Sequence, residues 1–240
     1  MEDMKYEDKP LADRPTTSFQ WCGVFDEANV GMKTVMPKHA TMSLDKLRQV
    51  RVESNANVVK RLRSSDDKAE AEVWRQVQED CRFGSMIEPK IATPDLLRTI
   101  SVTRRIPILQ EKDDGSEKVR VVDHATESWF KEATTATETM QTERIEVAII
   151  MCLMLMTYGH QVRMAKRDVK RAFRQLPLDI KAFGEFLWVI FAKGGDMFVS
   201  QHLACPFGAT SSTHSSHRVA EFMCACCRRL TLCPNRALGG

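Results

Sequence analysis

The sequence predicts an α+β fold in which a small antiparallel sheet is backed by helices. Three observations support this class: apolar residues at helical spacing across residues 43–82, two strand pairs that each flank a turn, and a helical pattern near the C-terminal end. Short turns join the strands of each pair, which makes the pairing antiparallel. Helices and strands are therefore grouped rather than alternating, as in α+β proteins.

The order of these patterns divides the chain into four zones. Residues 1–42 form an irregular N-terminal segment with few periodic apolar positions, which we expect to be poorly ordered. Residues 43–161 hold a helical region and the first hairpin. Residues 162–225 hold the second hairpin and the start of the last helix, and residues 226–240 are a cysteine-rich tail.

Residues 43–82 are predicted to form two charged amphipathic helices. Ser65-Asp66-Asp67 separates them and supplies a cap for the second helix. Their apolar positions recur every three or four residues, as one face of a helix requires. These positions are Leu44, Leu47, Val50, Val58, Val59 and Leu62 in the first helix, and Val73, Trp74 and Val77 in the second.

A β-hairpin is predicted next, with strands over residues 105–112 and 118–123. Asp113-Asp114-Gly115-Ser116 between them is a strong turn signal, because these residue types favour tight turns. A helix over residues 143–157, closed by Tyr158-Gly159, and a strand over residues 162–169 should follow.

The longest apolar run covers residues 147–156 and lies inside this predicted helix. Ten residues are about half of what a bilayer crossing needs. We therefore expect a buried helix and no membrane span.

A second hairpin is predicted over residues 186–203. Its strands, residues 186–191 and 197–203, flank the turn Gly194-Gly195. A last helix starts near Thr210 or Ser211, and its apolar positions include Val219, Phe222 and Met223.

Charge is mild overall but locally concentrated. The chain has 35 Lys and Arg against 32 Asp and Glu, a net charge of +3 that does not by itself define a nucleic-acid-binding protein. Between residues 160 and 181, however, only Asp168 and Asp179 oppose seven cations: Arg163, Lys166, Arg167, Lys170, Arg171, Arg174 and Lys181. This segment is either a solvated basic face or a contact for phosphate groups.

Eight cysteines do not form a disulfide pattern. Cys22, Cys81, Cys152 and Cys205 are scattered, and the N-terminal segment is charged and lacks the apolar core of a signal peptide. A reducing intracellular compartment, cytoplasmic or nuclear, is therefore expected. The sequence does not indicate an oligomeric state.

Four segments together resemble the fingers and the first half of the palm of retroelement reverse transcriptases, which are RNA-directed DNA polymerases. They are VWRQVQEDCRFGSMIEP (73–89), IPILQEKDDGSEKVRVVD (106–123), DVKRAFRQLPLD (168–179) and CPFGATSS (205–212). The first is similar to the approach to the fingers, the second to the fingertip hairpin, and the last two to catalytic and template-binding motifs. The resemblance covers roughly residues 70–225 and implies a fingers-and-palm fold, incomplete at its end.

The resemblance implies two-metal nucleotidyl transfer. Two divalent ions, Mg²⁺ or Mn²⁺, would hold the attacking and leaving oxygens in line, and Asp168 would be the first protein ligand, with the Val169 carbonyl beside it. Phe173 corresponds to the residue that excludes ribonucleotides by contacting the sugar. The alternatives are that Asp168 is a capping or ion-paired residue and that Phe173 is an ordinary core residue.

Other positions match nucleotide and template contacts of the family. Lys112 and Arg120 would bind the triphosphate, Arg as a two-pronged donor and Lys as a point charge. Phe207 and Gly208 would lie against the nascent base pair. Template contacts are Arg174, Gln175, Thr210 and Ser211. The hairpin cations are otherwise solvated charges, and the two hydroxyl residues helix caps.

The partners implied are an RNA or DNA template-primer and deoxynucleoside triphosphates. Two departures from the family bear on activity: Arg120 lies three residues before Asp123, where four is commoner, and no Asp follows Asp196. The family's third motif, an aromatic-x-Asp-Asp hairpin, completes the metal site. Its absence predicts a partial polymerase that is inactive alone, which leaves open whether the chain is an enzyme.

Two alternatives stay open. A non-catalytic nucleic-acid-binding module would keep the basic surface without the chemistry. A small zinc-dependent interaction protein would use Cys224, Cys226, Cys227 and Cys233 with His214 and His217. Their spacing matches none of the common zinc-finger or zinc-ribbon patterns, so zinc is not expected.

Overall fold

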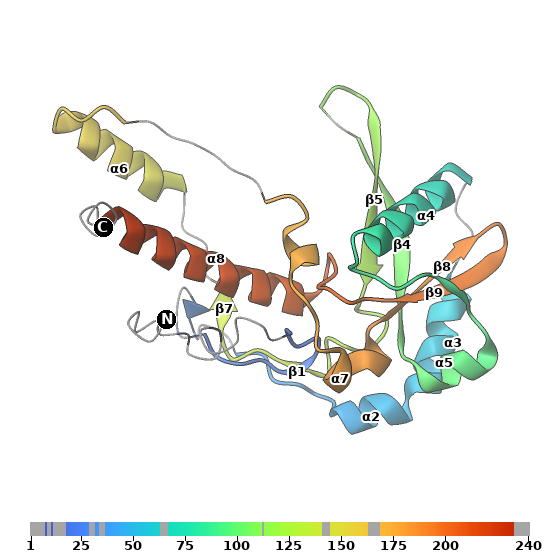
Figure 1. Ribbon diagram of the computed structural model, residues 1–240. Helices are drawn as coiled ribbons and strands as arrows, with labels where there is room; N and C mark the ends of the chain where they lie inside the picture. The colour runs from blue at the N-terminus through green and yellow to red at the C-terminus, as the bar shows by residue number, and fades with distance from the viewer. Residues whose placement is uncertain are drawn as a thin grey trace, which may run out of the picture.

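The computed structural model describes residues 8, 11, 18–28, 32–33, 37–62, 67–111, 113–140, 145–162 and 169–232. Within these residues the chain has an α+β fold, as the sequence predicts. Figure 1 shows a sheet with helices packed around it at one end of the molecule and two long helices extending from the other end. None of the helices in this part of the chain is long and apolar enough to cross a membrane.

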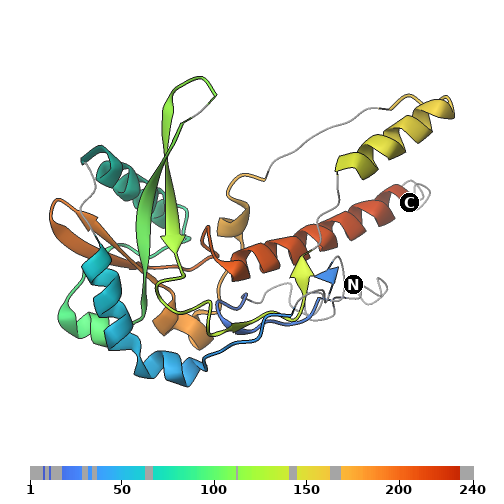
Figure 2. The ribbon, with the colours of Figure 1, turned by 180° about the vertical axis from the view of Figure 1, so that it is seen from behind.

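The main sheet has five strands in the order β3-β9-β8-β4-β5. The first predicted hairpin is confirmed as β4 (Val102–Glu111) and β5 (Glu117–His124). The second is confirmed as β8 (Trp188–Lys193) and β9 (Asp196–Gln201), while β3 (Lys90–Ile91) was not predicted. The tip of the β4–β5 hairpin projects beyond the rest of the sheet (Figures 1 and 2).

One pairing corrects the prediction of an antiparallel sheet. Val102, Thr103 and Arg104 of β4 pair in parallel with Trp188, Val189 and Ile190 of β8, so the sheet is mixed. A parallel pair needs a long crossover between its strands. The segment between β5 and β8 supplies that crossover, which joins the two hairpins into one sheet.

Three helices cover residues 44–82 where the sequence predicted two. These are α2 (Leu44–Gln49), α3 (Arg51–Arg61) and α4 (Asp67–Arg82), and the first predicted helix is interrupted at Val50. Ser43 caps α2 through its hydroxyl, which accepts a bond from the Lys46 N–H. The predicted cap at Ser65 and Asp66 lies outside the described residues. A short helix, α5 (Pro94–Thr99), was not predicted.

Helices cover both faces of the sheet, and the buried side chains of β8 point alternately towards one face and the other. Ile190 packs with Val58 of α3 and Ile100 in one core cluster. Val189 and Phe191 point the other way and pack with Val73 and Val77 of α4. Successive strand residues face opposite sides, so this apolar strand has a helix on each face. The predicted apolar faces of α3 and α4 are confirmed as core.

A third core cluster joins the N-terminal segment to the rest of the fold. Trp21 and Cys22 are buried in it with Leu47, Phe130 and Phe186. Two short pairings tie this segment down: β1 (Gly23–Val24) with β6 (Thr134–Thr135) and β2 (Met32–Lys33) with β7 (Thr139–Met140). Trp21, Cys22, Phe25 and Ala28 of this segment are therefore buried in the fold, where poor order was expected, whereas residues 37–41 are exposed.

The predicted helix over residues 143–157 is α6 (Ile145–Thr157), and residues 143–144 lie outside the described part. Its expected burial is wrong. Met151 and Met156 are 59% and 60% exposed, and most of the apolar side chains between them are similarly open. Figures 1 and 2 show α6 away from the sheet, near the far half of α8. The apolar run predicted burial, but none of the described elements packs tightly over it.

The remaining elements lie in the C-terminal part. The predicted strand over residues 162–169 lies outside the described residues except at its two ends, which are not in a strand. A 3₁₀ turn (Ala172–Gln175), α7 (Ile180–Phe183) and a second 3₁₀ turn (Gly184–Phe186) precede β8. The last predicted helix is confirmed as α8 (Thr210–Leu232). Arg218 on α8 forms a buried double hydrogen bond with Asp8, at 2.6 and 2.7 Å.

Candidate anion-binding pocket

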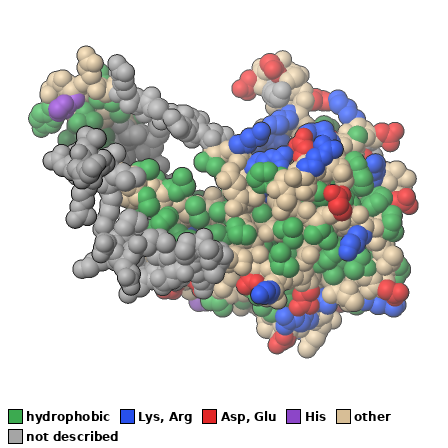
Figure 3. Space-filling view, viewed as in Figure 1, with side chains coloured by type: hydrophobic (Ala, Val, Ile, Leu, Met, Phe, Trp, Pro, Cys, Tyr) green, Lys and Arg blue, Asp and Glu red, His purple; other side chains and the backbone are tan. Residues whose placement is uncertain are grey.

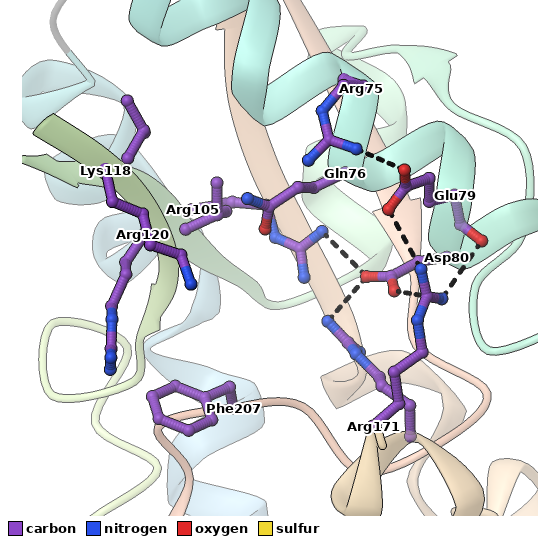
Figure 4. Close-up of a pocket in the computed structure, with 12 residues that line it drawn as sticks. Arg75, Gln76, Glu79, Asp80, Arg105, Lys118, Arg120, Arg171 and Phe207 are labelled. Carbon is purple, nitrogen blue, oxygen red and sulfur yellow. Dashed lines mark hydrogen bonds and ion pairs between the residues drawn. The ribbon is translucent and has the colours of Figure 1, made fainter. Parts of the chain in front are cut away.

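A cavity of about 440 Å³ lies between α4, β5, the 3₁₀ turn that starts at Ala172 and the loop before α8. Figure 4 shows the α4 side chains on one side and the β5 side chains on the other, with Phe207 below. Six of its lining residues are cations: Arg75, Arg105, Lys118, Arg120, Arg171 and Arg174. Among the lining residues that the structure describes, only two, Glu79 and Asp80, are acids. The cavity therefore favours an anionic ligand.

Two of these cations, Lys118 and Arg120, form the outer rim. They are two residues apart on β5, so both side chains lie on the same face of the strand. Both are exposed, and neither has an ion-pair partner within the described part of the chain. Figure 3 shows Lys and Arg side chains gathered beneath the hairpin tip. Their charges are therefore available to a ligand.

The floor of the pocket is a buried ion pair between neighbouring strands. Arg105 of β4 and Asp123 of β5 are register partners, and the guanidinium donates two hydrogen bonds, of 2.7 and 3.0 Å, to the carboxylate. Burial alone would raise the pKa of Asp123, but Arg105 and His202 hold that pKa well below its ordinary value. The same contact outweighs burial at Arg105 and raises its pKa. Both groups stay charged.

His202 links this ion pair to Arg174. Its Nδ1 lies 2.8 Å from Nη1 of Arg174, and its Nε2 lies 3.1 Å from Oδ2 of Asp123. A guanidinium has only donors, so Nδ1 must accept and the proton of the neutral ring sits on Nε2, facing Asp123. Burial lowers the pKa of His202 to about 4 despite the opposing effect of Asp123. The ring is therefore neutral at physiological pH.

The α4 side of the pocket is also paired. Arg174 lies 2.9 Å from Asp80, and Arg171 lies 3.0 Å from Glu79. Burial and the nearby Arg105 lower the pKa of Arg174. Arg75 bonds to Glu79 from the same helix. Both carboxylates among the described lining residues are thus paired with arginines. The rim cations Lys118 and Arg120, in contrast, have no ion-pair partner in this part of the chain.

Three of the residues singled out in the sequence, Arg120, Arg174 and Phe207, line this one cavity. Phe173 does not line the cavity: it packs against the core cluster that contains Trp21, and its ring centroid is 5.8 Å from that of Phe207. Gln175 lines an adjacent cavity and bonds to the Lys170 carbonyl. The structure brings these positions together from three separate motifs.

The other predicted site residues are placed differently. Val169 is 52% exposed. Asp168, the candidate metal ligand, and Lys112, a candidate triphosphate contact, lie outside the described residues. Thr210 and Ser211 line a separate, smaller cavity, and because α8 begins at Thr210 they occupy its first turn rather than its cap position.

Gly208 has a structural requirement of its own. Its φ is +99°, and a Cβ there would lie 3.1 Å from the Asp123 carbonyl oxygen. Glycine is therefore needed both for the backbone conformation and for close packing against β5. The sequence predicted that the backbone at Gly208 lies close to a base; in the structure this backbone lies close to Asp123 of the hairpin.

Four members of the buried charge network at the pocket were missed from the sequence: Asp80, Arg105, Asp123 and His202. The turn at Gly115 fixes the hairpin register, so the pairing of Arg105 with Asp123 could have been found from it. No local pattern connects Asp80 or His202 to this hairpin, because their contacts depend on how α4 and β9 pack.

No group of three or more His, Cys, Asp or Glu side chains suited to a metal occurs among the described residues. Cys224, Cys226 and Cys227 lie on α8, where consecutive residues point in different directions. Cys233, the fourth cysteine of the considered zinc set, lies outside that part.

The fold and this site define an α+β protein with a basic pocket above a buried ionic floor. No protein-family model matches the chain, and no curated protein matches it in sequence. The particular function is therefore inferred from the residues of the pocket.

Proposed function

We propose that the chain is a partial reverse transcriptase, an RNA-directed DNA polymerase of a retroelement, whose basic pocket binds the phosphates of a nucleotide. One observation carries the proposal. Arg120, Arg174 and Phe207 come from three motifs far apart in the sequence and line one cavity. Its rim cations have no ion-pair partner among the described residues and could bind a triphosphate, and the Phe207 ring lies beside them.

In this proposal each residue has a distinct role. Arg120 and Lys118 bind the phosphates, Phe207 lies against the base, and Phe173 contacts the sugar and excludes a 2′-hydroxyl. Asp168, with the Val169 carbonyl, would hold Mg²⁺ or Mn²⁺, which stabilises the charge that develops during phosphoryl transfer. The pocket's own carboxylates, Glu79 and Asp80, are paired with arginines and do not serve as ligands.

We expect binding without synthesis from these 240 residues. Nucleotidyl transfer uses two metal ions held by several carboxylates. The sequence contains no Asp after Asp196 to complete such a set. Removing metal ligands removes most of the electrostatic stabilisation of the transition state.

A second candidate, a non-catalytic nucleic-acid-binding module, is favoured by the charge pairing. The ionic floor is neutralised by the protein's own side chains, and the rim cations have no ion-pair partner in the part of the chain that the structure describes. Such a module would bind a phosphate backbone in a salt-dependent way and would not respond to Mg²⁺.

The test is the binding of fluorescent dNTP, rNTP and oligonucleotides, measured by anisotropy with and without Mg²⁺. A polymerase-type site should bind dNTP more tightly than rNTP, and only when Mg²⁺ is present. Asp168→Asn should remove the effect of Mg²⁺, Phe173→Ala should remove the sugar preference, and Arg120→Ala should weaken binding about tenfold or more.

Lys90→Ala is the matched control, since Lys90 is an exposed cation on β3 that does not line this pocket. Salt-dependent binding of oligonucleotides without Mg²⁺-dependent nucleotide binding would select the second candidate. No binding of any probe would contradict both.

A further inference from the structure

A second cavity, of about 560 Å³, adjoins the pocket and shares Glu79 and Arg171 with it. Its other lining residues are Arg82, Phe83, Lys170 and Gln175. Both volumes fall in the range of ligand pockets, about 300–1,000 Å³. Because they share two side chains, the two cavities lie side by side.

The second cavity repeats the composition of the first. Arg82 and Lys170 are exposed and have no ion-pair partner among the residues that the structure describes. Phe83 is 49% exposed, close to the 50% exposure of Phe207. Each cavity thus combines two free cations with one half-exposed aromatic ring.

Arg171 stands at the junction and is held in place. Its guanidinium lies 5.2 Å from the centroid of the Phe83 ring and bonds to Glu79, and its backbone has a positive φ of 56°. A positive φ is uncommon for a residue with a side chain, and here the surrounding contacts maintain it. The ring and the cation are therefore already positioned before a ligand binds.

We infer that a single-stranded polynucleotide binds across both cavities, with one base on Phe207 and another on Phe83. This inference rests on the proposed function and extends it, because it gives the strand a second contact site on α4. Aromatic platforms between cations are the arrangement that binds single strands: each ring stacks a base, and the cations contact phosphates. A duplex keeps its bases stacked on each other and would use only the cations.

The test compares labelled oligothymidylates of roughly 4 and roughly 16 nucleotides, the ends of the usual range of site sizes. The short probe can be held by the first cavity alone, and the long probe should span both. Phe83→Ala should weaken the long probe at least about fivefold and leave the short probe nearly unchanged. Arg120→Ala should weaken both.

Further variants separate the contribution of the cations to binding from that of base stacking. Arg82→Ala should lower the slope of log affinity against log salt by about one for the long probe only. Phe83→Trp should retain binding, because it keeps a stacking surface. Tyr158→Ala is the control, an exposed ring at the end of α6 that should have no effect.

The inference is overturned if Phe83→Ala leaves the long probe unaffected or weakens both probes equally. It is also overturned if a duplex of the same length, or polyglutamate, binds as tightly as the long single strand. These outcomes leave the proposed function standing. Wild-type protein that binds neither oligothymidylate overturns the inference alone, because the proposed nucleotide site is tested separately by Mg²⁺-dependent dNTP binding. Circular dichroism of each variant confirms that it is folded.

Discussion

The base and the tip of the β4–β5 hairpin carry the same residue types in opposite circumstances. At the base, Arg105 is buried and held by Asp123. Towards the tip, Lys118 and Arg120 on the same hairpin are exposed and have no ion-pair partner among the described residues. Paired cations fix the hairpin to the body, and unpaired cations remain available to a ligand. The difference separates a structural from a binding role within one element.

The largest loss of stability should come from removing the ion pair at the base of the hairpin. Asp123→Ala leaves Arg105 buried without a counter-charge and removes a partner of His202. We expect a loss of about 3–5 kcal/mol in the free energy of unfolding, measured by urea denaturation. The double variant Arg105→Met with Asp123→Leu should lose less, because no uncompensated charge stays buried. An equal loss in both variants would contradict an ionic origin.

A smaller effect should follow from pH. The pKa of His202 is lowered from 6.5 to about 4 by burial, so between these values the unfolded chain binds more protons than the folded one. The free energy of unfolding should therefore fall as pH falls from 6.5 to 4, by up to about 3 kcal/mol from this residue.

His202→Gln should flatten this pH dependence, as followed by urea denaturation across the same range. His214 on α8 provides the comparison. Burial lowers its pKa to about 4 as well, but it packs against Phe25 and does not line the pocket. His214→Gln should remove a separate part of the slope. An unchanged slope in His202→Gln would show that this ring does not titrate as described.

The smallest effect should be at the tip. Lys118→Ala and Arg120→Ala remove exposed charges that have no described partner, so each should change the free energy of unfolding by less than about 0.5 kcal/mol. The measurement is again urea denaturation, paired with the binding assays. A loss of 2 kcal/mol or more, on the order of that from a buried group, would mean that the rim also supports the fold.

Local signals in the sequence predicted local structure well. The turn at Gly115 predicted the first hairpin and the turn at Gly194-Gly195 the second, because turn residues and alternating strands lie within a few positions of each other. The spacing of Val73 and Val77 likewise predicted the buried face of α4. These features depend on neighbours in the chain.

Features that depend on distant segments were not predicted. The parallel pairing of β4 with β8 and the contact of His202 with Arg174 join parts that share no local pattern. The apolar composition of α6 predicted burial but said nothing of which surface would cover it. For the site, the motifs pointed to Arg120 and Phe207, and the hairpin register could have paired Arg105 with Asp123. Asp80 and His202 reach these residues only through tertiary packing.

The parallel joint between β4 and β8 also has a consequence for how the chain folds. Each hairpin can close over a short loop. Pairing Val102 with Trp188, however, requires the two ends of the long segment between them to meet, which costs more chain entropy. Such distant pairings raise contact order and slow folding. The two hairpins should therefore form early and independently, and the β4–β8 joint should set the rate. During synthesis, the first hairpin should therefore expose the unpaired edge of β4 until the second hairpin has emerged from the ribosome and can pair with it.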